Sequence, residues 1–525
     1  MATLRPNAPA PFRRSASDFR AAPSTRRRGL AFSALSGLLL IGAFPALDWG
    51  WLAWVALVPL LLTFSQCTRR DALWNGFVFG LVFFGGLISW LDVFAGHAIG
   101  PALGGVAWIG ATLAQAGVMW CFAGWASALH RSRNVWAWRL GVPALWAVLE
   151  WMRQLGALGT GWGDLAYAQH KSLLILQVTK LTGVWGLSFL IVLVNVTLAE
   201  LIEQRKIGRF PVATAALIVA ALAFGGITLS QEQLRPNFTA AALQGNVDPN
   251  VVWSNGRPES PVYVRRVMDT YHQMGQQSKA AFVVWPETTF PGFLLTDEQL
   301  RGEVARDALQ NKQAVLVGGR AFDALAKQET NTAFTFNPMG LVSGQYSKQQ
   351  LVPFGEFVPF HQYLPVLRLL HLAIYDMKPG APNQPLSDGG ATVGKVGIAV
   401  CYESSYGWLT REQVARGAGI LAVITDDCWF GHTAAASQHA SIAAVRAAES
   451  DRYLIRSAAT GISQVIDPTG KVIAEAGLFR QAIVAAPVQS RTTITPYVRW
   501  GDWFIWACFL ILVGIVGAEK RPRLA

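Results

Sequence analysis

The sequence has few cysteines and few charged residues for its length. Its 525 residues include 5 cysteines and 14% charged side chains, against 52% hydrophobic ones. Five cysteines with no Cys-x-x-Cys spacing and no His/Cys cluster argue against a disulfide framework and against a metal site. So little charge among so many apolar residues excludes an ordinary soluble globular protein. The composition indicates a polytopic membrane protein with a soluble portion.

The net charge of +12 does not indicate a nucleic-acid-binding protein. Much of the excess lies in the N-terminal tail and in short loops between apolar runs, where basic residues set membrane orientation. We therefore expect no nucleic-acid partner and a chain that contacts the lipid bilayer.

Eight apolar stretches have roughly the length needed to cross a bilayer. They lie at 29–46, 51–66, 73–95, 104–129, 136–152, 175–201, 211–229 and 501–517. Basic residues cluster before the first stretch and after the second, fourth, sixth and eighth. The loops around Asp48 and His97 contain no Lys or Arg. The positive-inside rule then predicts that both termini are cytoplasmic and that the long segment before the last stretch is external.

This pattern predicts four regions. They are a basic, disordered cytoplasmic tail (1–28), transmembrane helices 1–7 (29–229), an external catalytic domain (230–498), and transmembrane helix 8 with a cytoplasmic tail (499–525). The external segment alternates short apolar runs with helical patterns, which predicts an α/β domain. Predicted strands include Ala281–Pro286, Gly344–Lys348 and Thr392–Cys401, and predicted helices are 261–279, 297–312, 406–417 and 435–451.

Three reactive side chains stand at the ends of predicted strands. Cys401 ends one apolar run, Glu287 follows another, and Lys348 ends a third. A thiol, a carboxylate and an ammonium in such positions favour acyl transfer through a thioester. In this interpretation Cys401 is the nucleophile, Glu287 the proton acceptor and Lys348 the group that stabilises the oxyanion. Each residue alone is more often structural, and only the combination favours catalysis.

The motifs around these residues resemble a known family. Trp285-Pro286-Glu287, Lys348 with Glu356 eight residues later, and Cys401-Tyr402-Glu403 are similar to the Glu–Lys–Cys signature of the carbon–nitrogen hydrolase (nitrilase) superfamily. With the flanking helices, the chain resembles the apolipoprotein N-acyltransferase family of Gram-negative bacteria. The resemblance implies an α-β-β-α sandwich domain joined to a membrane bundle of eight transmembrane helices.

The resemblance also implies a function. Members transfer a fatty acyl chain from a membrane phospholipid to the N-terminal amine of the diacylglyceryl-cysteine of an apolipoprotein, which is the last step of bacterial lipoprotein maturation. The implied location is the inner membrane, with the catalytic domain in the periplasm. The chemistry runs as a ping-pong reaction through a Cys401 thioester and needs no cofactor, because ester and thioester are already activated. Phospholipid and apolipoprotein are the expected partners.

Several further residues are assigned supporting positions. By resemblance, Glu356 orients the lysine and the incoming amine. Glu403 is either a structural carboxylate that supports the cysteine turn or a catalytic residue. Asn331 and Tyr402 are expected to contact the three catalytic residues and support them. Trp253 is either an external loop residue that touches lipid or a core aromatic. An apolar arm at 357–370 is expected to cover acyl chains or to pack on the membrane part.

Three questions stay open in the sequence. Cys428 stands where the family usually has a small residue, and it has no assigned role. In an oxidising compartment it could form a disulfide with Cys401, but the proposed chemistry needs Cys401 as a free thiol. The loop that contains Trp162 lines a lipid entrance or is a simple interfacial loop. The alternatives to N-acyl transfer are a membrane-tethered amidase or nitrilase, in which water resolves the thioester, and a transporter or sensor without chemistry.

Overall fold

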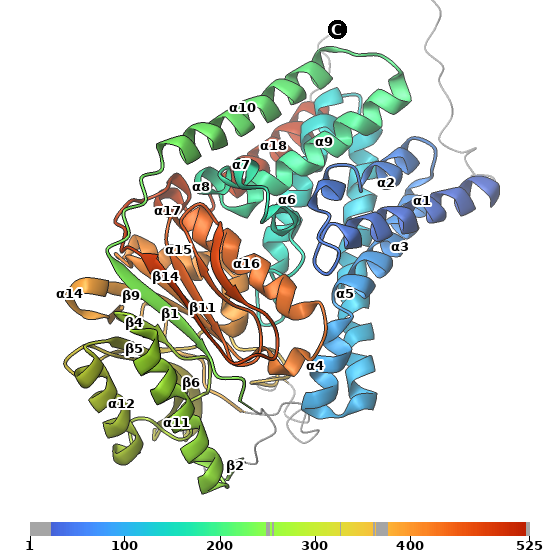
Figure 1. Cartoon of the computed structure of the whole chain (residues 1–525). Helices are drawn as coiled ribbons and strands as arrows, with labels where there is room; N and C mark the ends of the chain where they lie inside the picture. Colours follow the sequence, from blue (N-terminus) through green and yellow to red (C-terminus); the bar gives the residue numbers. More distant parts are fainter. Residues whose placement is uncertain are drawn as a thin grey trace, which may run out of the picture.

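The structure, a computed structural model, describes residues 23–247, 253–254, 257–325, 327–360, 363 and 376–520. A helical part lies against a part built on two β-sheets (Figure 1). The helical part contains α1 to α10 and the last helix, α18, so the chain leaves it after α10 and returns at its end. The sheet part therefore has connections to the helical part at both of its ends.

The sheet part holds two six-stranded sheets. The first has the order β14 (Ala482–Val488), β1 (Phe238–Gln244), β4 (Phe282–Val284), β5 (Ala314–Asp323), β6 (Gln328–Phe336) and β7 (Val342–Ser347). The second has the order β13 (Val472–Ala476), β12 (Ser463–Ile466), β11 (Leu454–Ala458), β10 (Ile420–Thr425), β9 (Lys395–Val400) and β8 (Ser387–Asp388). In each sheet three neighbouring central strands are parallel, β1-β4-β5 and β9-β10-β11, so their carboxyl ends share one edge.

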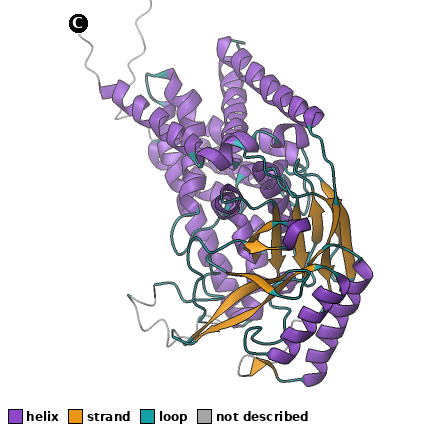
Figure 2. Ribbon diagram, turned by 90° about the vertical axis from the view of Figure 1, so that its left-hand side faces the viewer, coloured by secondary structure: helices purple, strands orange, loops and turns teal. Residues whose placement is uncertain are grey.

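The two sheets pack face to face and helices cover their outer faces. Val284 and Leu316 of the first sheet share a buried cluster with Ile398 and Ile424 of the second. Helices α11 (Pro261–Ser278) and α12 (Glu298–Asn311) cover the first sheet, while α15 (Gly407–Ala415) and α16 (Ala435–Ser450) cover the second. Figure 2 shows the strands gathered beside the helical part, with paired helices below them. This is the predicted α-β-β-α order.

The helical part does not resolve into eight long spans. Among the described residues, three helices are long and apolar enough to cross a membrane: α5 (Pro101–His130), α9 (Val184–Gln204) and α10 (Arg209–Gln231). Helices α3 (Arg69–Leu87) and α4 (Trp90–Ile99) make a fourth if the pair, bent by 56°, is one span. Shorter apolar helices cover Gly50–Ser65, Leu173–Thr182 and Trp503–Ala518. The last of these belongs to α18 (Trp503–Lys520), and the helical part also contains α1 (Pro23–Gly42) and α6 (Val142–Arg153).

The breaks in the predicted spans have local causes. The stretch predicted as 51–66 divides into two 3-10 turns around α2 (Val58–Leu62), which has proline in its first turn. The bend between α3 and α4 directly follows the pair Gly85-Gly86, which lowers helix propensity. Gly183, with φ of 64°, ends the short α8 (Thr179–Thr182) before α9 begins. Hydropathy alone does not detect these interruptions.

The first helix begins before the first predicted span. Helix α1 begins at Pro23 and includes Arg26, Arg27 and Arg28, so the last six residues of the predicted disordered segment are helical. Residues 1–22 lie outside the described part of the chain.

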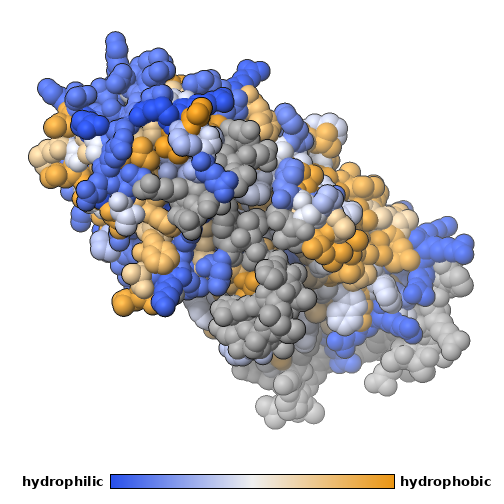
Figure 3. Space-filling view, turned by 90° about the horizontal axis from the view of Figure 1, so that it is seen from below, coloured by the Kyte–Doolittle hydropathy of each residue, from blue (hydrophilic) through white to orange (hydrophobic). Residues whose placement is uncertain are grey.

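Apolar side chains are exposed on the helical part. In the view of Figure 3, hydrophobic residues gather on the side of α4 and α5, and hydrophilic residues dominate the opposite side, over the sheet part. On α5, Val106 and Ile109 are more than half exposed, and on α18 Leu510 is 73% exposed. Exposed apolar faces of this kind are typical of helices that face lipid.

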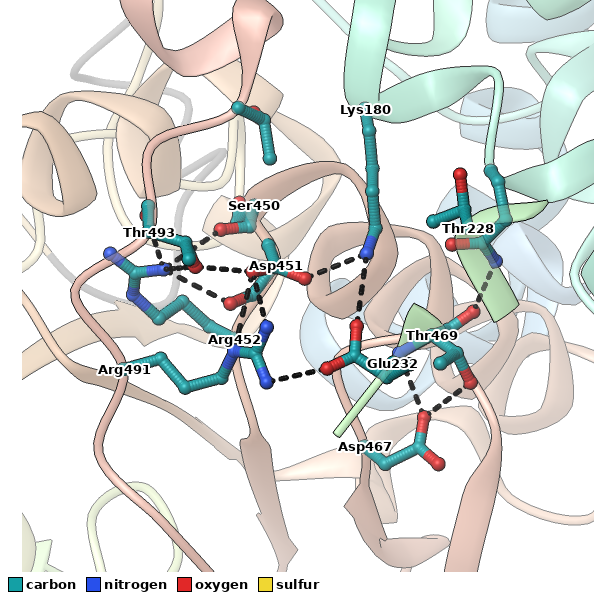
Figure 4. Close-up of polar contacts among 12 residues, drawn as sticks. Lys180, Thr228, Glu232, Ser450, Asp451, Arg452, Asp467, Thr469, Arg491 and Thr493 are labelled. Carbon is teal, nitrogen blue, oxygen red and sulfur yellow. Dashed lines mark hydrogen bonds and ion pairs between the residues drawn. The ribbon is translucent and has the colours of Figure 1, made fainter. Parts of the chain in front are cut away.

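A buried ionic cluster joins the helical part to the sheet part (Figure 4). Asp451, at the end of α16, accepts from Lys180 of α8 at 2.6 Å and from Arg491 at 2.7 Å. Arg491 also pairs with Glu232, directly after α10, at 2.7 Å. Burial tends to raise the pKa of Asp451, but Lys180 and Arg491 outweigh it and lower that pKa to about 2. Two cations and two anions thus close a neutral ring between the parts.

Candidate active site

Cys401 stands at a sharp turn between β9 and a short 3-10 helix, Cys401–Ser405. Its φ is 54°, in the left-handed region, which costs a non-glycine residue roughly 1–2 kcal/mol. The carboxylate of Glu403 accepts the Val400 N–H at 2.8 Å and so fastens the turn to the end of the strand. The strained turn is therefore held by a residue of its own segment, because Glu403 and Val400 are only three positions apart.

Glu287 is brought to the same place from the other sheet. It follows β4 through Trp285-Pro286, and the turn lies so close to β5 that a Cβ on Gly318 would stand 2.2 Å from the Pro286 carbonyl oxygen. Only glycine permits that approach. Glu287 Oε2 accepts the backbone N–H of Asp426, directly after β10, at 2.8 Å. The carboxylate thus bridges the carboxyl ends of strands in both sheets.

Lys348 lies between two carboxylates. It directly follows β7 and is 1% exposed. Its Nζ donates to Glu287 Oε1 at 3.3 Å and to Glu356 Oε1 at 2.9 Å. Asn331 Nδ2 donates to the same two oxygens, at 2.7 and 3.0 Å. Sequence reasoning placed Glu356 and Asn331 beside the triad, and the structure has both residues in contact with Glu287 or Lys348.

The electrostatics favour a neutral thiol and a charged lysine at rest. Burial raises the pKa of the Cys401 thiol well above its usual value, and Glu287 raises it further while Lys348 opposes the rise. Burial alone would lower the pKa of Lys348, but Glu287 and Glu356 outweigh it and raise that pKa. Attack by Cys401 therefore requires a base at the moment of reaction. Glu287 Oε2 accepts one hydrogen bond from the described residues, which leaves a lone pair for the thiol proton.

Glu403 supports the turn from both sheets. Its carboxylate accepts from the backbone N–H of Gln349 at 2.6 Å and of Gln350 at 3.1 Å, and from the Tyr346 hydroxyl at 3.0 Å. These donors lie beside Lys348, so Glu403 fixes the lysine segment against the cysteine turn. The structure therefore favours the structural interpretation of Glu403 over a catalytic one.

We expect the Glu403 contribution to stability to depend on pH. Burial raises the pKa of Glu403 from 4.5 to about 7, although backbone N–H groups oppose the rise. The folded state therefore holds this proton more tightly than the unfolded state, and stability is lost as pH rises from about 4.5 to about 7. Relative to Glu403→Gln, the unfolding free energy of the wild type should fall by about 3 kcal/mol across this window. Thermal unfolding in detergent at several pH values measures it. The exposed Glu412→Gln is the control, and parallel curves for wild type and Glu403→Gln would contradict the assignment.

A cavity of about 500 Å³ joins this cluster to the helical part. Side chains of α4 and α5, Trp162 and its loop, and Cys401, Tyr402 and Phe430 of the sheet part all line it. The cavity surface is almost entirely apolar. The sequence left open whether the Trp162 loop lines an entrance, and the structure places Trp162 in the wall of this cavity.

The other predicted residues have different outcomes. Tyr402 lines the cavity and donates to the Gly159 carbonyl at 2.9 Å, so it anchors the cysteine turn to the helical part. Cys428 is buried, is not bonded to Cys401, and contacts the Asp426 carboxylate. Trp253 lies in the short strand β2 (Trp253–Ser254), which pairs with β3 (Arg257–Pro258). Most of the predicted apolar arm, at 361–362 and 364–370, lies outside the described residues.

Sequence reasoning missed two polar residues of α16. His439 is fully buried and contacts the Cys401 backbone, and Gln438 binds both cavity tryptophans, Trp90 and Trp162. Asp427 and Arg456 complete this cluster around His439. The available signal was an adjacent Gln-His pair in the alanine-rich first half of the helix, where two large polar groups need buried partners.

Two family models and several curated relatives match this chain. The family described as the N-terminal domain of apolipoprotein N-acyltransferase matches residues 36–197, and the carbon-nitrogen hydrolase family matches residues 239–497. The apolipoprotein N-acyltransferase of Geobacter metallireducens is 33% identical, covering 97% of this chain and 96% of the relative. This chain belongs to the apolipoprotein N-acyltransferase family.

Other similarities cover most or half of the chain. The apolipoprotein N-acyltransferase of Nitrosomonas europaea is 31% identical, covering 89% of this chain and 93% of the relative. Among solved structures, a Saccharomyces cerevisiae protein from branch 10 of the nitrilase superfamily is 21% identical, with a TM-score of 0.36, and covers 49% of this chain and 91% of that one.

Proposed function

We propose that this chain transfers a fatty acyl chain from a membrane phospholipid to the N-terminal amine of a diacylglyceryl-cysteine on an apolipoprotein. The observation that carries the proposal is the position of Cys401. Its turn lies in the wall of an apolar cavity formed partly by the membrane-side helices, with the Glu287 and Lys348 pair behind it. A thiol at such a cavity meets an acyl ester that enters from lipid rather than from water.

The reaction has two halves. In the first, Glu287 takes the Cys401 proton, Sγ attacks the ester carbonyl, and Lys348 stabilises the tetrahedral oxyanion. The ester C–O bond then breaks, Glu287 gives the proton to the leaving oxygen, and lysophospholipid departs. In the second, the lipoprotein amine attacks the thioester and loses a proton to Glu287. The C–S bond breaks, and the thiolate regains a proton.

The proposal includes the membrane topology. We propose eight spans, both termini in the cytoplasm, and a periplasmic domain at 230–498 of a chain in the inner membrane. The charge pattern of the loops supports it: the loops around Asp48 and His97 have no basic residue, whereas Arg131 and Arg205 lie in loops expected on the cytoplasmic side.

The test is a transfer assay with purified full-length protein, phospholipid and a diacylglyceryl-modified lipopeptide. We expect a lipopeptide that gains one acyl mass, together with lysophospholipid, and neither product from Cys401→Ala. Release of free fatty acid without acylated peptide would contradict the proposal and favour a hydrolase. Transfer that survives in Cys401→Ala would rule out the thioester.

A further inference from the structure

Helix α16 reaches the nucleophile through one side chain. His439 Nε2 lies 3.0 Å from the Cys401 carbonyl oxygen and 2.8 Å from Ser404 Oγ. A carbonyl oxygen only accepts, so Nε2 carries the hydrogen in the contact with Cys401. The imidazole is completely buried, which excludes solvent as its partner.

The opposite ring nitrogen lies between a donor and an acceptor. His439 Nδ1 lies 3.1 Å from Arg456 Nη2, which can only donate, and 3.1 Å from Asp427 Oδ1. Asp427 already pairs with Arg456 at 2.6 Å, which satisfies its charge. Burial lowers the pKa of His439, and Arg456 lowers it further. The neutral tautomer with hydrogen on Nε2 accepts from Arg456, and the protonated ring donates to Asp427 instead; in both forms Nε2–H donates to the Cys401 carbonyl.

We propose that His439 is a positioning residue for the thioester chemistry: its Nε2–H holds the Cys401 carbonyl and thereby the strained turn that aims Sγ at the cavity. Through the trans peptide, this hydrogen bond also affects the next residue. Because C=O and N–H point in opposite directions across a peptide, fixing the Cys401 carbonyl also fixes the direction of the Tyr402 N–H. Glu403 holds the strand side of the turn, and His439 holds the other side.

The same residue contacts the cavity wall. The His439 ring lies 5.5 Å from the Trp162 ring and 6.2 Å from the Phe430 ring, and all three line the cavity. Its neighbour Gln438 accepts from Trp162 Nε1 at 2.6 Å and from Trp90 Nε1 at 3.2 Å. The wall that would contact an acyl chain and the nucleophile's backbone are therefore braced by adjacent residues of one helix.

The test compares His439→Gln with His439→Asn in the full-length protein. The Gln amide reaches as far as Nε2 and can donate to the Cys401 carbonyl, whereas the Asn amide is one carbon shorter. The first readout is the rate at which iodoacetamide alkylates Cys401, followed by peptide mass spectrometry without lipid. We expect the Asn variant to react about tenfold more slowly than the wild type and the Gln variant to recover most of the rate. Ser441→Ala, buried on the same helix, is the control and should react like the wild type.

The second readout is acylation of Cys401 by phospholipid, where we expect the same order and a change in kcat with little change in KM. Equal rates for the Gln and Asn variants, or a wild-type rate in the Asn variant, would overturn the inference. The inference about His439 rests on the proposed function only in this second readout, the acylation by phospholipid. If the wild type alkylates normally but takes up no acyl group, the proposed function fails and the positioning test still stands.

Discussion

Glu287→Gln should lower the rate of acyl transfer by about 10²- to 10⁴-fold while the protein stays folded. The amide oxygen can still accept from Asn331 and Lys348, while the amide nitrogen replaces the oxygen that accepts the Asp426 N–H, so only that one contact is lost. It does not take a proton from Cys401, whose pKa is raised by burial. The neutral thiol then lacks its base in the first half-reaction, and the amine lacks it in the second.

The measurement is the single-turnover rate of Cys401 acylation, followed by intact mass. Glu298→Gln, at an exposed position in the first turn of α12, is the matched control and should keep the wild-type rate. A Glu287→Gln variant that acylates within tenfold of the wild type would show that another group accepts the proton.

Lys348→Met should lose both rate and stability. Removal of the ammonium leaves Glu287 and Glu356 buried together with only the Asn331 amide between them. Breaking a buried charge cluster in this way costs about 3–5 kcal/mol of unfolding free energy. Loss of the oxyanion partner costs about 10²- to 10³-fold in the rate of the chemical step.

Lys348→Arg separates the two effects. The guanidinium keeps the charge and should recover part of the stability, but its larger planar group does not fit the site of the ammonium and the rate should stay low. Thermal unfolding and single-turnover acylation together measure both variants. A Met variant with wild-type stability and rate would contradict the assignment of Lys348.

The chemistry of the site could be predicted from the sequence because it lies at strand ends. The predicted helices 261–279, 297–312, 406–417 and 435–451 correspond to α11, α12, α15 and α16 within two residues at each end. Glu287, Lys348 and Cys401 all follow strands, and the strands predicted to end at Lys348 and Cys401 end one residue earlier. These features depend on local periodicity and on turn residues, which one sequence carries.

The contacts across the two sheets could not be predicted in the same way. That Glu287 Oε2 binds the Asp426 N–H depends on how one sheet stacks on the other, which alternating apolar residues do not specify. The role of His439 depends on a contact with a residue 38 positions away in the chain, which the pattern of its own helix does not specify. The helix breaks around α2 and at Gly183 were missed because a hydropathy window averages over single prolines and glycines.

The central claim is that Cys401 carries the acyl group, and intact mass tests it most directly. Purified wild type and Cys401→Ser are incubated with phospholipid alone. The account predicts one fatty-acyl adduct on the wild type that hydroxylamine removes, lysophospholipid in equal amount, and no hydroxylamine-sensitive adduct on the Ser variant. Absence of any adduct on folded, lipid-bound wild type would contradict phospholipid as the donor to Cys401.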